Sequence, residues 1–490
     1  MASYRQTGSR AYLTGIVLVA VIGGLLFGYD TAVISGAERG LQAFFSGAAN
    51  FSYTDGLHGF TTSSALIGCI IGALISGFMA SRLGRKKSLF AAGIMFFLSA
   101  LGSYHPEFLF FQKGVATKGL LVAFNLYRVL GGVGVGLASA LCPMYIAEVS
   151  PANKRGTLVS WNQFAIIFGQ LVAFYVCCLI MGNHLDVAFV STEDALDMTK
   201  QQDAWTIATS WRYMFGSEAV PAALFALLIC LVPETPRYLV MVGQDTKAMN
   251  VLTRINGKSQ AQRILEDIKS TITVKTEKLM TYGFICIFVG VMLSVFQQAV
   301  GINAVLYYSN DIFKSIGMTD AKMTTVIMGV VNILFTLLAI FTVEKLGRKP
   351  LLIWGSLGMA VGALGVAMFF GHEGQEMVTA ISLMIYSACF MFSWGPICWV
   401  LIAEIFPNTI RGAAVAIAVA FQWISNFIVS SSFVPMFNMH LTEGDDFGHW
   451  FTYGLYGVIC VIAALFVWKL VPETKGKTLE DMTKLWKQTK

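Results

Sequence analysis

Residues 393–412 read SWGPICWVLIAEIFPNTIRG, an apolar run that ends in a glutamate and is followed by an arginine and a glycine. Residues 143–156 read PMYIAEVSPANKRG and repeat this arrangement. In both stretches six residues separate the two charges, which are Glu404 and Arg411 in the first and Glu148 and Arg155 in the second. An ordinary loop needs no such spacing, so the recurrence indicates two copies of one structural unit.

Two further motifs recur in the same order around these stretches. LGRKK occurs at 83–87 and LGRKP at 346–350, and the tripeptide PET occurs at 233–235 and again at 472–474. Three motifs in register are not expected by chance. A parallel repeat of two multi-span halves is a transporter design, in which the substrate is held between the halves near the middle of the membrane.

The composition excludes a soluble protein. Of the 490 residues 56% are hydrophobic and 13% are charged, whereas soluble domains have about 45–50% apolar and about 25% charged residues. Apolar runs such as 11–30 and 280–296 approach the roughly 20 residues that span a bilayer. The net charge of +6 does not indicate nucleic-acid binding, because the basic residues cluster in the links between these runs.

The fold class that follows is an all-α membrane protein. Hydropathy predicts about twelve transmembrane helices in two halves of about six helices each. The predicted limits are 11–36, 59–80, 88–106, 119–142, 157–181 and 212–232 in the first half, and 279–302, 321–343, 350–371, 377–402, 411–436 and 448–470 in the second.

The basic links set the expected orientation. Lys and Arg gather after the even-numbered spans, whereas the links after the odd-numbered spans are poor in them. The positive-inside rule therefore places both termini in the cytoplasm. We expect an N-terminal half at 1–235, a cytoplasmic linker of short amphipathic helices at 236–278, a C-terminal half at 279–472 and a cytoplasmic tail at 473–490.

Together the motifs resemble those of the sugar porter family of the major facilitator superfamily, over about residues 11 to 480. The matching segments include GGLLFGYDTAVISG (23–36) and QQAVGINAVLYY (297–308), beside the repeats quoted above. Within the family, the chain is most similar to the bacterial D-xylose–proton symporters. One departure is Ser81, where the family often has an acid before the first Gly-Arg motif; the second copy keeps the acid as Glu344.

The resemblance implies a proton-coupled sugar symporter of the major facilitator fold, which carries D-xylose by alternating access across the inner membrane of a cell. A facilitative uniporter for hexoses or pentoses is the alternative, and an acid inside the first span argues against it because a uniporter has little use for one. A sugar sensor built on the transporter fold is a third reading. Such a sensor is expected to carry a long signalling tail.

The expected partners are a small sugar, a proton and the lipid bilayer. The sequence has no Walker-type phosphate loop, so we expect no ATP hydrolysis. It also has no nucleophile–base pattern and no metal-ligand spacing. We therefore expect neither enzymatic activity nor a cofactor, a metal or a nucleic-acid partner.

Neutral amides and aromatic rings inside the spans are the candidate sugar ligands. Sugar hydroxyls both give and take hydrogen bonds, which amides match, and an unsatisfied polar group in a span is costly. Each amide alone is equally well explained as a contact between helices. Gly301 is expected to weaken the helix at the end of the seventh span, so that backbone and amides can face a cavity. Pro396 is expected to remove one helical hydrogen bond from the tenth span. The resemblance implies sugar binding by Phe27, Gln163, Gln170, Gln297, Gln298, Asn303, Tyr307, Asn332, Gly395, Trp399 and Gln422.

Three charged residues fall within the apolar runs: Asp30, Arg128 and Glu218. An ionisable group at membrane depth marks a functional site unless it is half of a static ion pair. The resemblance implies that Asp30 carries the proton, that Arg128 is its switching partner and that Glu218 modulates both. Burial opposes charge on a carboxyl and a close arginine favours it, so movement of Arg128 would load and unload the proton.

Charges at the cytoplasmic ends of the spans form the candidate gate. The positive-inside rule explains the other Lys and Arg in the links, but it does not explain a glutamate at a fixed distance before an arginine in both halves. The resemblance implies ion pairs between helices that close the cytoplasmic side. The residues concerned are Arg85, Glu148, Arg155, Glu344, Arg348, Glu404 and Arg411.

Overall fold

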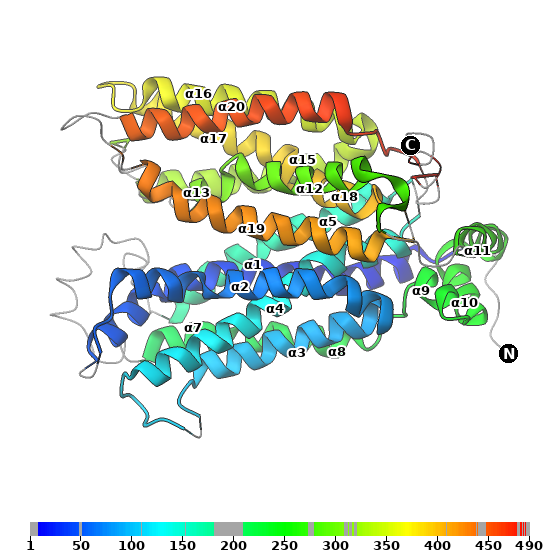
Figure 1. Cartoon of the computed structure of the whole chain (residues 1–490), viewed down its shortest axis with the longest axis horizontal. Coiled ribbons are helices and arrows are strands. Elements are labelled where there is room, and N and C mark those ends of the chain that lie inside the picture. Colours follow the sequence, from blue (N-terminus) through cyan, green and yellow to red (C-terminus); the bar gives the residue numbers. More distant parts are fainter. Residues whose placement is uncertain are drawn as a thin grey trace. The chain divides into compact units, whose positions relative to one another are not determined.

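The computed structural model is helical throughout its described part (Figure 1). It describes residues 8–48, 51–108, 110–151, 153–180, 209–272, 279–307, 312, 316–317, 321–407, 409–437, 439, 447–477, 481–482, 484 and 486. Within these ranges every regular element is a helix, so the expected all-α class is confirmed.

Each predicted span of the first half corresponds to helical segments. They are α1 (Arg10–Ser46), α2 (Asp55–Arg82), α3 (Arg85–Tyr104), α4 (Lys118–Val149), α5 (Arg155–Ile180), α7 (Trp211–Ser217) and α8 (Ala219–Ile229). Of these, α1 and α4 extend ten and seven residues beyond their predicted ends. The predicted linker contains α9 (Pro236–Met241), α10 (Asp245–Asn256) and α11 (Lys258–Ile272).

The second half begins with a single 3₁₀ turn, η3 (Leu279–Tyr282). Its helices are α12 (Phe284–Ala299), α13 (Ile302–Tyr307), α15 (Ala321–Leu346), α16 (Arg348–Phe369), α17 (Glu376–Phe392), α18 (Trp394–Glu404), α19 (Arg411–Phe437) and α20 (Phe447–Leu470). Over the described residues, 11 helical segments are long and apolar enough to cross a membrane, and α12 is a shorter apolar helix.

The chain forms two compact units, which we describe separately. The N-unit comprises Arg10–Tyr145 and Ala165–Tyr238. The C-unit comprises Met1–Ser9, Ile146–Phe164 and Leu239–Lys490. The start of α5 therefore groups with the second half of the chain.

An aromatic core fills one end of the N-unit. Phe124 on α4 lies between Trp211 and Phe215 of α7, with ring centroids 5.6 and 5.4 Å away. Phe44, near the end of α1, completes the cluster with its centroid 5.6 Å from that of Trp211. Edge-to-face and tilted rings at these distances pack favourably. The core thus fixes α7 against α1 and α4.

In the C-unit α16 packs against both α17 and α20, and Figure 1 shows α16 and α20 side by side. The linker helices α10 and α11 pack on each other and are amphipathic, as predicted. The apolar residues buried on α10 are Ala248, Val251, Leu252 and Ile255. An ion pair of 2.5 Å between Lys269 and Asp245 joins the two helices on their solvent side.

Within the described residues three predicted spans are interrupted, and two of the breaks fall at residues that no sequence pattern marks. The seventh span breaks as expected at Gly301, where φ is +88° and glycine is favoured. The sixth span ends α7 at Ser217 and restarts after Glu218. The tenth breaks at Ser393, three residues before Pro396. The expected loss of a helical hydrogen bond at Pro396 is wrong: the proline lies in the first turn of α18, where the N–H groups have no helical partner in any case.

Candidate functional site

A buried charged cluster joins three spans of the N-unit. Arg128 Nη1 on α4 donates to Asp30 Oδ1 on α1 at 2.5 Å, and both side chains are almost fully buried. Glu218, at the junction of α7 and α8, is equally buried and interacts electrostatically with both. The Phe215 ring covers the Arg128 guanidinium, 4.9 Å from the ring centroid. The three predicted charges therefore meet at one place.

This cluster contains more acid than base. Two carboxyl groups share one guanidinium, and among the described side chains Asp30 Oδ2 and Glu218 Oε1 are buried without a hydrogen-bond partner. Two buried carboxyls so close together do not both ionise readily. The arrangement is therefore suited to holding a proton that it can release.

A network of amides lies where the seventh span breaks in the C-unit. Gln297 Oε1 accepts hydrogen bonds from Gln298 Nε2 at 2.7 Å and from Gln422 Nε2 at 2.6 Å. Asn303 Nδ2 donates to Gln298 Oε1 at 2.6 Å. Because α12 ends before Gly301 and α13 starts after it, amides from both segments and from α19 converge. A Cβ at Gly301 would lie 2.4 Å from the Tyr456 ring, so a larger residue does not fit.

The other predicted sugar ligands of the C-unit lie on α5, α15 and α18. Trp399 on α18 is 3% exposed. A Cβ at Gly395 would lie 3.6 Å from Gln163 Nε2, so these two residues are neighbours. Asn332 Oδ1 accepts a hydrogen bond of 2.8 Å from Ser387 Oγ, which makes it a contact between α15 and α17.

Amide groups in this network keep hydrogen-bonding capacity for a ligand. Each primary amide has two N–H donors and one carbonyl acceptor, and the internal bonds use only part of them. The carbonyls of Gln163 and Gln422 have no hydrogen-bond partner among the described residues. Donors and acceptors side by side suit a neutral polyhydroxyl ligand.

The remaining predicted ligands are placed differently. Phe27 on α1 and Gln170 on α5 belong to the N-unit and are partly exposed. Tyr307 is the last residue of α13, and its side chain lies outside the described residues.

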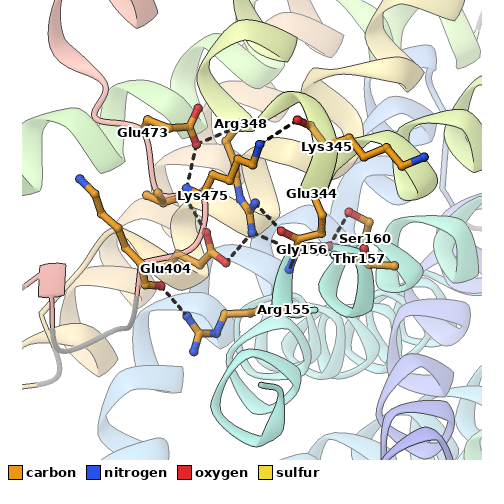
Figure 2. A network of polar contacts seen from close by, with 12 residues as sticks. Arg155, Gly156, Thr157, Ser160, Glu344, Lys345, Arg348, Glu404, Glu473 and Lys475 are labelled. Atoms are coloured by element: carbon orange, nitrogen blue, oxygen red, sulfur yellow. Dashed lines mark hydrogen bonds and ion pairs between the residues drawn. The ribbon is translucent and has the colours of Figure 1, made fainter. Parts of the chain in front are cut away.

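A second charged network lies in the C-unit, at the end of the spans that carries the Gly-Arg-Lys motif (Figure 2). Arg348 Nη1 pairs with Glu344 Oε2 at 2.8 Å, and Arg348 Nη2 pairs with Glu404 Oε1 at 3.2 Å. Glu344 Oε1 also accepts from the backbone N–H groups of Gly156 at 2.7 Å and Thr157 at 3.3 Å. A carboxylate at the first turn of α5 is favoured by the helix dipole.

Three of the other predicted gate residues donate hydrogen bonds to backbone carbonyls. Arg155 Nε donates to Ala147 O at 3.0 Å, and Arg411 Nη2 donates to Phe406 O at 2.8 Å. Arg85, in the N-unit, donates to Ala80 O at 3.1 Å. Glu148 is 8% exposed.

The glutamate of each PET motif binds the backbone of a Gly-Arg-Lys motif, which explains why the two motifs recur together. Glu234 Oε1 accepts from the backbone N–H of Arg85 at 3.1 Å, at the start of α3. Glu473 Oε1 accepts from the backbone N–H of Arg348 at 3.0 Å, at the start of α16. Each glutamate thus satisfies free N–H groups of a helix start within its own unit. Their recurrence identified both motifs in the sequence, but neither motif contains a feature that predicts binding between the two.

The chain beyond the last span also reaches the second network, which sequence reasoning missed. Thr474 Oγ1 donates to Glu404 Oε2 at 2.7 Å, and Arg155 Nη1 donates to Lys477 O at 3.4 Å. Trp486 Nε1 donates to Ile405 O at 2.8 Å. No grouping of three or more His, Cys, Asp or Glu suited to a metal occurs in the part of the chain that the structure describes.

Comparison with known proteins gives consistent matches over nearly the whole chain. Residues 16–486 match the family described as "Sugar (and other) transporter". The D-xylose-proton symporter of Escherichia coli (strain K12) is 46% identical over 98% of this chain and 96% of its own length. The glucose facilitated diffusion protein of Zymomonas mobilis is 36% identical over 98% of this chain and 99% of its own length.

A solved structure agrees with these sequence matches. The proton:xylose symporter XylE of the major facilitator superfamily, bound to 6-bromo-6-deoxy-D-glucose, superposes with a TM-score of 0.86 and 46% identity, over 97% of this chain and 99% of that one. Taken with the membrane-length helices described above, these matches show that the chain is a multi-pass membrane protein that belongs to the sugar transporter family, with the twelve-helix fold of the major facilitator superfamily.

Proposed function

We propose that the chain is a proton-driven symporter of a neutral monosaccharide, with D-xylose as the first substrate to test. The observation that carries this proposal is the buried cluster of Asp30, Arg128 and Glu218 in a chain 46% identical to a D-xylose-proton symporter. An ionisable group at membrane depth is costly and is retained where it has a function.

Asp30 is the proton carrier in this proposal. Its carboxylate is compensated by Arg128 in the arrangement seen here. If the helices separate the pair during transport, burial favours the neutral acid and a proton binds; when the pair re-forms, the proton leaves. The outward-facing and inward-facing states then differ in their affinity for the proton, which symport requires.

The amide network supports the choice of a neutral sugar. Gln297, Gln298, Asn303 and Gln422 offer hydrogen bonds without net charge, and Trp399 offers an aromatic face. A carboxylate or phosphate substrate would call for a positive partner there, and the four amides supply none.

Facilitated diffusion is the second candidate function, because the Zymomonas relative is named for it. The two functions make opposite predictions for a proton gradient. We further propose that the protein lies in the inner membrane of a bacterial cell with both termini in the cytoplasm, following the distribution of Lys and Arg between the links.

The deciding experiment measures uptake by proteoliposomes for a panel of labelled sugars, with and without an imposed inward proton gradient. We expect accumulation of D-xylose above equilibrium only when the gradient is present. Equilibration at the same rate with and without the gradient would identify a uniporter.

Replacing one amide of the network by alanine should weaken sugar binding several-fold while the protein still folds. Gln298→Ala and Asn303→Ala each remove one or two hydrogen bonds of about 0.5–1.5 kcal/mol apiece. Equilibrium binding on purified protein measures the effect. Asn125→Ala is the matched control, because that amide lies within a span but contacts Thr61 in the N-unit. Wild-type affinity in Gln163→Ala, Gln298→Ala and Asn303→Ala together would reject the site.

Neutralising Glu344 should weaken closure at the end of the spans that carries Arg348. Glu344→Gln keeps the shape of the side chain but removes the charge that Arg348, Gly156 and Thr157 share. A hydrogen bond to a charged group contributes about 1.5–3 kcal/mol, so we expect about a tenfold shift toward the state open at that end.

Accessibility of a cysteine introduced near the start of α5 to a membrane-impermeant reagent measures this shift. Glu373→Gln, an exposed glutamate beyond the opposite end of α16, should leave the labelling rate unchanged. If Glu344→Gln labels at the wild-type rate from both sides, the network is not a gate.

A further inference from the structure

One hydrogen bond joins the two segments that carry the acidic residues of the charged cluster. Tyr29 directly precedes Asp30 on α1, and Ser217 ends α7 directly before Glu218. Tyr29 Oη lies 2.6 Å from Ser217 Oγ, and the tyrosine is 2% exposed. The function proposed above assigns no role to this contact.

The direction of the bond is determined by its surroundings. Ser217 Oγ also lies 2.5 Å from the carbonyl oxygen of Met214, which can only accept. A serine hydroxyl has a single proton. Ser217 therefore donates to Met214, and the Tyr29 hydroxyl donates to Ser217.

The opposite end of α7 is fixed by a buried ion pair. Arg212 donates two hydrogen bonds to the Glu107 carboxylate, one of them 2.7 Å from Nη1 to Oε2. The guanidinium lies against the Phe44 and Trp211 rings, at 5.2 and 4.4 Å from their centroids. The short helix is thus held at both ends, and Glu218 follows at the end that Tyr29 holds.

We propose that Tyr29 is a positioning residue for proton coupling: through Ser217, its hydroxyl holds the Glu218 carboxyl against Asp30. This inference rests on the proposed proton-driven symport. It adds a structural reason why the two acids act as one unit, although they come from helices far apart in the sequence.

The titratable and charged groups near Asp30 and Tyr29 determine which charges the Tyr29–Ser217 hydrogen bond can affect. Asp30 faces Arg128 from α4, Glu218 from the junction of α7 and α8, and the Cys69 thiol from α2. Tyr29 faces Ser217, Glu218 and, from α5, the Cys177 thiol. Arg128 is the only cation in this set of groups, so a change in the distance between the two acids alters how they share its charge.

Loss of the Tyr29–Ser217 hydrogen bond should shift the pH dependence of uptake in a predictable direction. Neighbouring buried carboxyls take up a shared proton at a higher pH than a lone carboxyl beside an arginine. Tyr29→Phe lets Glu218 move away and leaves Asp30 with Arg128. The midpoint of gradient-driven uptake against pH should shift toward acid by about half to one unit, since one neutral hydrogen bond changes an equilibrium constant by no more than roughly tenfold.

The experiment compares this pH midpoint among proteoliposomes that contain wild type, Tyr29→Phe, Ser217→Ala or the double variant. Each single variant should produce the same shift and the double variant no more, because both remove one contact. Ser217→Thr keeps the hydroxyl and should restore the wild-type midpoint. The pH dependence of sugar binding by purified protein gives a second readout that does not depend on transport.

Tyr145→Phe is the matched control, because it removes a buried hydroxyl that donates to Pro233 O at 2.6 Å within the same unit. Whatever it does to the rate, it should not move the midpoint. An unshifted midpoint in folded Tyr29→Phe and Ser217→Ala, or an equal shift in Tyr145→Phe, overturns the inference while wild-type accumulation upholds symport. Absence of gradient-driven accumulation in the wild type overturns both.

Discussion

Asp30→Asn should bind sugar with nearly wild-type affinity and yet accumulate none of it under a proton gradient. The amide keeps the size of the carboxyl but cannot ionise, so the variant resembles the protonated state permanently. It should still exchange labelled for unlabelled sugar across the membrane, because exchange needs no proton release. Proteoliposomes with an inward proton gradient measure accumulation, and the same vesicles without a gradient measure exchange.

The control for this variant is Asp267→Asn, which removes a carboxylate from the linker helix α11, outside the predicted spans. It should accumulate sugar at the wild-type level. Wild-type accumulation by Asp30→Asn would exclude Asp30 as the coupling site. Failure of both accumulation and exchange would instead assign Asp30 a structural role with Arg128.

Glu107→Gln should give the largest loss of stability among single substitutions outside the spans. Glu107 and Arg212 are 2% and 6% exposed at their side chains, and they form a bidentate pair. Removing one partner of a buried ion pair leaves the other charge uncompensated, which costs about 3–5 kcal/mol. The effect is measured as the thermal unfolding temperature of the purified protein, with loss of sugar binding as the readout.

The nearby His105→Ala is the matched control. His105 Nδ1 lies 3.1 Å from the same carboxylate, but its side chain is 43% exposed, so its contact should contribute little. Equal destabilisation by the two substitutions would show that burial of the Arg212 pair is not what stabilises this corner. An unchanged unfolding temperature in Glu107→Gln would contradict the prediction outright.

The same pair predicts how stability depends on pH. Burial raises the pKa of the Glu107 carboxyl, but the hydrogen bonds and the charge of Arg212 lower it by more, so the pKa lies below its ordinary value of 4.5. A carboxyl whose pKa is lower in the folded state stabilises the protein above its unfolded pKa, and this contribution is lost as the pH falls through the folded pKa. The wild type should therefore lose stability in that acid range, and Glu107→Gln should lack this part of the loss.

Hydropathy and motif recurrence were sufficient to predict the fold class and the approximate spans. Both are local properties of the chain: a helix must be apolar over about 20 residues to cross a bilayer, and this requirement is visible in any window of that length. The break at Gly301 was also readable, since only glycine adopts its φ of +88° without strain. The breaks at Glu218 and Ser393 were not, because neither residue is a strong helix breaker on its own.

The partners of the polar residues depended on packing. The amide network joins Gln297 to Gln422, 125 residues apart, and Glu234 binds the helix start at Arg85, 149 residues away. Motifs marked Gln297, Glu234 and Arg85, and its polarity within a span marked Gln422, yet none of these signals says which distant group a side chain will contact. Tyr29 lies within the motif at 23–36 and Ser217 directly before Glu218, but nothing in either stretch indicates that the two side chains meet; their hydrogen bond exists only because the aromatic core places α7 against α1. Helix type and span limits follow from short-range physics, whereas hydrogen-bond partners follow from long-range packing that no local window contains.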